Sequence, residues 1–156
     1  MTCLKLTTLE TGRIIDVERR GLMNVLVTGD RNWGSFVIIE DALNEIDEKH
    51  LDDGEEINLY HGAARGADMI AAEHAKELGW TVHPFLADWS KYGKAAGPIR
   101  NRELLAAASP DVVLAFHDNL PASKGTKNMV NMAVKEGVKV LLFDASGKEV
   151  QQVVPS

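Results

Sequence analysis

The residues with the clearest capacity for chemistry lie in one eight-residue segment, HGAARGAD, at positions 61–68. The segment follows a short apolar run and leads directly into a helical pattern over 69–78. A strand that turns through glycines into a helix directs unpaired N–H groups and the positive end of the helix dipole at one place, which favours a bound phosphate or carboxylate. The segment therefore predicts an anion-binding loop, with Gly62 and Gly66 in the turn and Arg65 as a nearby cation.

Three side chains of this loop each have a functional and a structural interpretation. Arg65 could contact a phosphate, or it could pair with a carboxylate and brace the loop. Asp68 stands in the first turn of the predicted helix, where it could bind a ribose hydroxyl or cap the helix N–H groups. His61 could transfer a proton or bind phosphate, although a histidine at a strand end is often held by a structural hydrogen bond. The sequence leaves these alternatives open.

Three further polar, glycine-containing segments occur at 28–33, 88–101 and 121–126. Each follows a run of residues that is predicted to be a strand, so each is a loop that could reach a ligand. The additional ligand-binding residues expected in them are Gly29, Arg31, Trp33, Lys94, Arg100, Asn101, Ser123, Lys124, Gly125 and Thr126.

The charged and aromatic members of this set also have structural alternatives. Arg31 and Trp33 could bracket a base or ribose by stacking, or Trp33 could pack on the following helix while Arg31 stays solvated. Arg100 could form a bidentate contact with phosphate or an ion pair with an acidic side chain. Lys94 lies in a segment too long and polar for a tight turn, which indicates either a rim over the ligand or a solvated loop.

The elements that must position these loops alternate between strand and helix from residue 24 onward. The five apolar runs that indicate buried strands are 25–28, 57–60, 81–85, 111–116 and 138–143. Between them, apolar residues recur at helical spacing. This pattern predicts an α/β fold: a single Rossmann-like, doubly wound, mainly parallel sheet of about five strands with helices on both faces. Ligands bind outside the carboxyl ends of such strands, which is where the polar segments fall.

Length and patterning together predict one domain, because 156 residues of ordinary composition fit a single core. We place this domain at residues 23–145. Residues 146–156 are expected to be a C-terminal tail. Residues 1–22 lack clear periodicity, so we interpret them as a leader arm, an edge strand around 13–17, or an upstream extension.

Composition excludes several classes of function. The net charge of −6 and the absence of a cluster of basic residues argue against nucleic acid as a partner. No apolar run is long enough for a membrane helix, and the single cysteine excludes an internal disulfide, so we expect a cytoplasmic protein. The histidines outside the loop lack metal-ligand spacing, so we expect no metal site and no cofactor.

The chain resembles the YspA-like branch of the SMF/DprA-LOG (SLOG) superfamily of Rossmann-like nucleotide-ligand-binding proteins. The resemblance covers about residues 23–143 and rests on three ordered motifs. They are the glycine–arginine–tryptophan loop at 29–33, the HGxxRGAD signature at 61–68, and the block DWxxYGKAAGPIRN at 88–101. The resemblance implies a nucleotide-derived ligand and a homo-oligomer, a dimer or larger. Relatives called LOG are phosphoribohydrolases, which release a base from a nucleoside monophosphate.

The sequence departs from the superfamily pattern at its fourth motif. The PGGxGT phosphate loop is PASKGT at 121–126, and Met129 stands where the LOG hydrolases have the glutamate that acts at the glycosidic bond. A thioether cannot transfer a proton or stabilise an oxocarbenium charge. Asp30 and Asp88 could do acid–base work only if both reached one bond, so we assign no catalytic residue. We therefore predict a protein that senses or sequesters a nucleotide or nucleotide-derived phosphate ligand; the alternative is a LOG-like nucleotide N-glycosidase.

Overall fold

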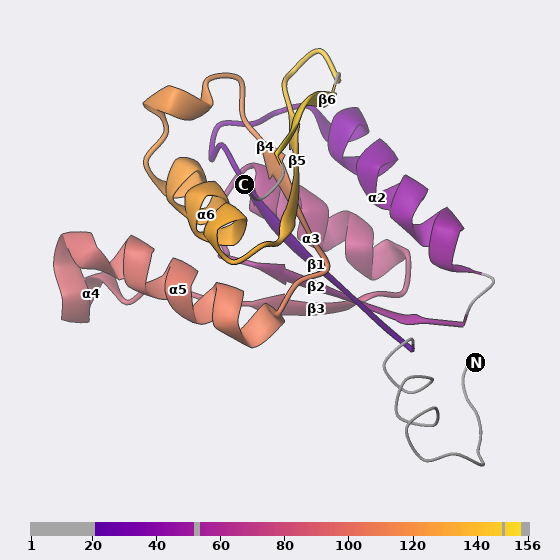
Figure 1. Cartoon of the computed structure of the whole chain (residues 1–156), viewed down its shortest axis with the longest axis horizontal. Helices are drawn as coiled ribbons and strands as arrows, with labels where there is room; N and C mark the ends of the chain where they lie inside the picture. Colours follow the sequence, from indigo (N-terminus) through magenta and orange to yellow (C-terminus); the bar gives the residue numbers. More distant parts are fainter. Residues whose placement is uncertain (1–20, 52–53, 148, 154–156) are drawn as a thin grey trace.

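The computed structural model describes residues 21–51, 54–147 and 149–153. Within this part of the chain, six strands form one sheet in the order β3-β2-β1-β4-β5-β6 (Figure 1). All neighbouring strands are parallel except β5 and β6, which are antiparallel. The strands are β1 (Leu22–Gly29), β2 (Glu56–His61), β3 (Thr81–Pro84), β4 (Val112–Phe116), β5 (Lys139–Phe143) and β6 (Glu149–Val153).

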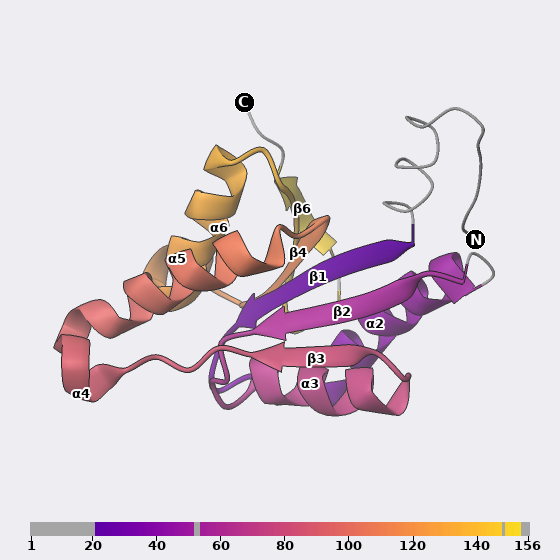
Figure 2. The same ribbon diagram turned by 90° about the horizontal axis from the view of Figure 1, so that it is seen from below.

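Helices cover both faces of the sheet (Figures 1 and 2). One face packs against α2 (Phe36–Leu51) and α3 (Ala67–Glu77). The other packs against α5 (Ala96–Ala108) and α6 (Gly125–Lys135). The remaining short helical turns are α4 (Trp89–Tyr92), η1 (Gly93–Ala95) and η2 (Leu120–Ala122).

The central strands are apolar on both faces because each face has its own hydrophobic core. Val25 and Val27 of β1 belong to the core under α2 and α3, whereas Leu26 between them belongs to the core under α5 and α6. All five residues of β4 are buried. Side chains alternate between the faces of a strand, so a continuous apolar run is what a doubly covered parallel strand requires. The predicted Rossmann-like fold is confirmed.

The two strands at the centre of the sheet, β1 and β4, also mark the point where the strand order reverses. From β1 the chain adds β2 and β3 on one side, and then returns to place β4 and β5 on the other. In a parallel sheet, the loops that follow two such strands separate and leave a crevice at their carboxyl ends. The fold therefore places a ligand-sized opening between the loop after Gly29 and the loop after Phe116.

Two features at the ends of the chain bear on the sequence predictions. Within the expected tail at 146–156, Glu149–Val153 form the additional strand β6 along the edge of β5, which the sequence analysis did not predict. The expected leader, including its edge strand at 13–17, lies outside the described residues. None of the helices in the described part of the chain has the length and apolar character needed to cross a membrane.

Candidate functional site

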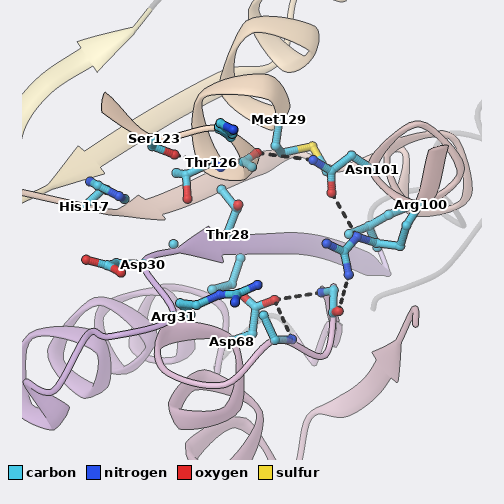
Figure 3. A pocket seen from close by; sticks show the side chains of 17 residues that line it. Thr28, Asp30, Arg31, Asp68, Arg100, Asn101, His117, Ser123, Thr126 and Met129 are labelled. Atoms are coloured by element: carbon cyan, nitrogen blue, oxygen red, sulfur yellow. Dashed lines mark hydrogen bonds between the residues drawn. The ribbon is translucent and has the colours of Figure 1, made fainter. Parts of the chain in front are cut away.

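A cleft of about 340 Å³ opens at the carboxyl ends of β1 and β4 (Figure 3). Its walls come from the loops after β1, β2 and β4, from the second and third turns of α5 and from the start of α6. The lining residues are Val27, Thr28, Gly29, Asp30, Arg31, Gly62, Ala64, Asp68, Arg100, Asn101, Leu104, His117, Ser123, Lys124, Gly125, Thr126 and Met129.

The loop between β2 and α3 is folded around the carboxylate of Asp68. The Oδ2 atom of Asp68 accepts hydrogen bonds from the backbone N–H groups of Gly62, at 3.0 Å, and Ala64, at 3.4 Å. These are donors that the sequence analysis assigned to an external anion, and the protein's own carboxylate occupies them. Asp68 therefore has a structural role, but its carboxylate closes its own loop instead of capping the N–H groups of α3, which was the alternative considered from the sequence.

Asp68 is a buried acid with one oxygen that has no partner. Its side chain lines the cleft although the residue is only 5% exposed. Burial raises the pKa of Asp68 from 3.8 to about 7, against the opposing effects of the two backbone donors and of the positive charge of Arg100. Both loop hydrogen bonds go to Oδ2, and no described residue donates to Oδ1. Above its pKa, where it is ionised, Asp68 thus presents a free acceptor to the cleft.

Gly66 is required by a close approach between two loops. Its φ is +80°, and a Cβ at this position would lie 2.4 Å from the carbonyl oxygen of Arg31. The next residue, Ala67, donates its N–H to the carbonyl of Asp30 at 3.2 Å. The glycine therefore joins the loop after β2 to the loop after β1, and its own position is outside the cleft lining.

His61 also has a structural role. It is buried, and its Nδ1 accepts a hydrogen bond from the N–H of Ala63 at 3.0 Å. Burial, followed by the positive charges of Lys76 and Arg100, lowers the pKa of His61 to about 4. The imidazole is therefore neutral at physiological pH, and it does not line the cleft.

Arg100 holds two loops together at the edge of the cleft. Its Nη1 donates to the carbonyl oxygen of Gly62 and, at 3.4 Å, to that of Phe85, while its Nε donates to Oδ1 of Asn101 at 3.0 Å. Burial lowers the pKa of Arg100, and the charge of Asp68 partly offsets this effect. Nη2 makes no hydrogen bond with any described residue, so one edge of the guanidinium group remains available to a ligand.

Asn101 continues this bracing to α6. The residue is buried, and its Nδ2 donates to the carbonyl of Gly125 at 3.2 Å (Figure 3). The same nitrogen donates to Oδ1 of Asn128 at 3.0 Å. Together with the bond from Arg100 to its Oδ1, these contacts use both amide hydrogens and one of the two acceptor positions of the oxygen. Asn101 therefore fixes the position of the first turn of α6 relative to α5.

The start of α6 is capped by Ser123, one of the residues that replaces a glycine of the superfamily motif. Its hydroxyl oxygen accepts from the N–H groups of Thr126, at 3.1 Å, and Lys127, at 3.2 Å. The N–H of Gly125 makes no hydrogen bond to any residue that the structure describes, and Gly125 and Lys124 are both exposed. One amide and one ammonium group at this helix end are thus open to the cleft.

Most of the residues expected to bind ligand do line the cleft, but five do not. Besides His61 and Gly66, these are Trp33, Arg65 and Lys94. Trp33 is 6% exposed and packs 5.7 Å from the ring of Phe116, so it belongs to the core rather than to a stacking surface. Arg65 is exposed and lies 3.5 Å from the Oδ1 of Asn32, and Lys94 is exposed in η1.

The cleft also contains residues that the sequence analysis did not select. Thr28 is the last residue but one of β1. His117 directly follows β4, and its Nδ1 accepts a hydrogen bond from the N–H of Asn119 at 2.9 Å. Both stand at the carboxyl end of an apolar run, so the rule that located the polar segments also identifies them. The described residues contain no group of three or more His, Cys, Asp or Glu side chains that could hold a metal ion.

Comparison with known proteins assigns the chain to a family. Residues 23–92 match the sequence model of the YspA, cpYpsA-related SLOG family. The Gene 61 protein of Mycobacterium phage D29 is 40% identical in an alignment of 127 positions that covers 78% of this chain and 97% of that protein. The chain therefore belongs to the YspA-related SLOG family.

Two solved structures share the fold at low sequence identity. DNA processing protein A (DprA) from Streptococcus pneumoniae matches with a TM-score of 0.60 and 16% identity over 81% of this chain. The chain covers 52% of DprA, about half of its length. The X-ray structure of TM1055, a structural genomics target, matches with a TM-score of 0.52 and 20% identity, covering 76% of this chain and 72% of TM1055. At these identities the likeness concerns the fold alone.

Proposed function

We propose that the protein binds a nucleotide or a nucleotide-derived phosphate ligand in the cleft between β1 and β4. The observation that carries this proposal is the convergence of an open helix N-terminus with three cationic side chains at the switch point of the sheet. The helix is α6, and the cations are Arg31, Arg100 and Lys124. A helix N-terminus with unpaired amides and adjacent positive charge favours a phosphate group.

The phosphate belongs at α6 rather than at α3. At α3 the loop donors from Gly62 and Ala64 already bond to Asp68, and a carboxylate there repels a second anion. At α6 the N–H of Gly125 is open, Lys124 lies beside it, and the 11-residue helix supplies its dipole. This arrangement reverses the emphasis of the sequence analysis, which placed the principal anion site in the loop at 61–68.

The apolar lining of the cleft supports binding without cleavage of the glycosidic bond. Val27, Leu104 and Met129 are almost completely buried beneath the cleft, so its floor is apolar and carries no group that can transfer a proton. Met129 occupies the position of the LOG glutamate, and its thioether can neither donate nor accept a catalytic proton. A sensing or sequestering module is therefore favoured over a phosphoribohydrolase.

The partner implied by this site is a small molecule. The net charge of −6 does not suit the multiple phosphate contacts that nucleic-acid binding requires, even though one structural neighbour is a DNA processing protein. We also propose, from the family resemblance, a homo-oligomer located in the cytoplasm. Sedimentation velocity at several protein concentrations tests the oligomeric state.

The proposed function is tested by proton NMR of a mixture of AMP, ADP, cyclic nucleotides, ADP-ribose and NAD before and after protein is added. Selective line broadening without new signals is the expected result. The growth of free-base signals would restore the glycosidase alternative, and no change in any component would count against nucleotide binding.

A pair of lysine variants locates the phosphate within the cleft. Replacing Lys124 by Ala should weaken the binding of the retained nucleotide about threefold, as expected for an exposed cation. The matched control is Lys135→Ala, which removes the same charge from the opposite end of α6, where the helix dipole disfavours an anion. Equal affinities of the two variants would contradict the placement of the phosphate at the start of α6.

A further inference from the structure

Asp68 has a hydrogen-bonding capacity that neither its loop nor a phosphate can use. The residue is more than nine-tenths buried, yet it lines the cleft, and its Oδ1 accepts from no described residue. Oδ1 is not one of the fully buried unpartnered atoms of the described residues, so it faces the cleft, where a ligand that supplies a donor can bond to it. Phosphate oxygens at neutral pH are acceptors and carry negative charge, so they do not fit beside Oδ1.

The position of Asp68 relative to α6 narrows the choice of donor. In Figure 3, Asp68 lies on the side of the cleft formed by the loop after β2, whereas Ser123 and Thr126 lie on the opposite side, with Thr28 of β1 between them. A ligand with its phosphate at α6 must therefore present a neutral hydrogen-bond donor across the cleft, on the side of Asp68.

In a nucleotide, the donors nearest to the phosphate along the molecule are the sugar hydroxyls. One methylene group and the sugar ring separate a 5′-phosphate from the vicinal 2′,3′-diol, while the amino and imino donors lie farther away on the base. The residues that form the apolar lining, Val27, Leu104 and Met129, offer no polar contact to the base edge. The diol is thus the group that a phosphate at α6 brings toward Asp68.

We propose that Asp68 is the sugar-reading residue of the site, accepting through Oδ1 a hydrogen bond from the vicinal diol of a ribose, so that the protein prefers ribonucleotides to their deoxy forms. This inference rests on the proposed nucleotide-binding function. It assigns the two halves of the cleft different tasks: the start of α6 with Lys124 binds the phosphate, and the loop closed by Asp68 selects the sugar.

The test compares the adenosine, guanosine, cytidine and uridine 5′-monophosphates with their 2′-deoxy and 3′-deoxy forms by NMR titration. The titrations are made at about pH 8.5, where Asp68 is ionised. For the base that binds, removal of the contacted hydroxyl should then weaken binding to the native protein about tenfold or more, because hydrogen bonds to charged groups are strong. The comparison requires no variant. Equal affinity of the ribose and both deoxy forms would overturn the inference while leaving the proposed function intact, whereas no binding of any nucleotide would overturn both.

Two matched variants then assign the discrimination to Asp68. In Asp68→Asn the amide oxygen can still accept from Gly62 and Ala64, but its nitrogen presents donors to the cleft in place of an acceptor. The preference for ribose should fall to within about twofold, whereas the deoxy form should keep its affinity. Asp30→Asn makes the same charge change in the same cleft and should keep the preference. An undiminished ribose preference in Asp68→Asn, or an equal loss of affinity for both forms, would overturn the inference.

Discussion

The guanidinium group of Arg100 lies directly against the Cα of Gly62. Its Nη1 donates a hydrogen bond to the carbonyl oxygen of Gly62. A Cβ built on Gly62 would lie 2.7 Å from Nη1 and 2.8 Å from Cζ. The two residues are 38 positions apart in the chain and belong to two different motifs. The glycine is therefore required by a side chain that packs on it from α5.

Adding a methyl group at this contact should destabilise the protein. Gly62 does not have a left-handed φ, so the obstacle to Gly62→Ala is the position of Arg100 alone. Displacing that side chain breaks its bonds to the carbonyls of Gly62 and Phe85, and we expect a loss of about 1–3 kcal/mol in the free energy of unfolding, measured with urea. Gly34→Ala adds the same group where nothing lies within 4 Å and should be nearly neutral. Similar losses in both variants would contradict this account.

The same contact makes the effects of two variants non-additive. Arg100→Ala should also cost about 1–3 kcal/mol, because it leaves two loop carbonyls without their donor. In the double variant Gly62→Ala/Arg100→Ala, the steric conflict is gone, so the total loss should be at least about 0.5 kcal/mol smaller than the sum of the single losses. Additivity within error in the urea experiments would show that the methyl group acts elsewhere.

Much of the fold follows from the sequence because parallel strands covered on both faces need continuous apolar runs. The runs at 25–28 and 111–116 therefore indicated the two central strands, and the rule that ligands bind at their carboxyl ends located the cleft. The edge strand β6 carries no such run, since its residues 149–153 include one glutamate and two glutamines. Its pairing with β5 depends on the tertiary structure rather than on a local pattern.

The hydrogen bonds within the loops could not be predicted from the sequence. The motif correctly suggested amides turned toward an anion, but the path of the loop decides that the anion is the carboxylate of Asp68. The burial of Trp33 depends on Phe116, 83 positions later, because the two rings meet only after β1 and β4 pair. Interactions between distant segments therefore set which motif residues reach the cleft.

The raised pKa of Asp68 gives the protein a specific dependence of stability on pH. The folded state keeps a proton on Asp68 up to about pH 7, whereas the unfolded chain releases it near pH 3.8. Between these values the folded state binds more protons, so this group's contribution is present at low pH and is lost as the pH rises through that window. His61 has the opposite effect. Its pKa is about 4 in the folded state and 6.5 in the unfolded chain, so the free energy of unfolding decreases as the pH falls below 6.5.

A comparison with Asp68→Asn isolates the contribution of the acid, since the contribution of His61 is common to both proteins. From pH 5 to pH 7, the free energy of unfolding of the native protein should fall relative to that of the variant, by at most about 1.4 kcal/mol per pH unit. Above pH 8 the difference should become constant. Urea unfolding at half-unit steps of pH measures it, and a difference that does not change with pH would show that Asp68 is ionised throughout this range.

The cap formed by Ser123 competes with a ligand for the amides of α6. Its hydroxyl occupies the N–H groups of Thr126 and Lys127, so Ser123→Ala should lower the stability of the free protein by about 1 kcal/mol, as for other lost helix caps. The same change releases two donors at the proposed phosphate site, and inorganic phosphate and nucleoside monophosphates should then bind several-fold more tightly. Isothermal titration with phosphate measures the gain, and urea unfolding measures the loss. Weaker phosphate binding by Ser123→Ala would contradict this competition. It would show instead that the hydroxyl of Ser123 contacts the phosphate.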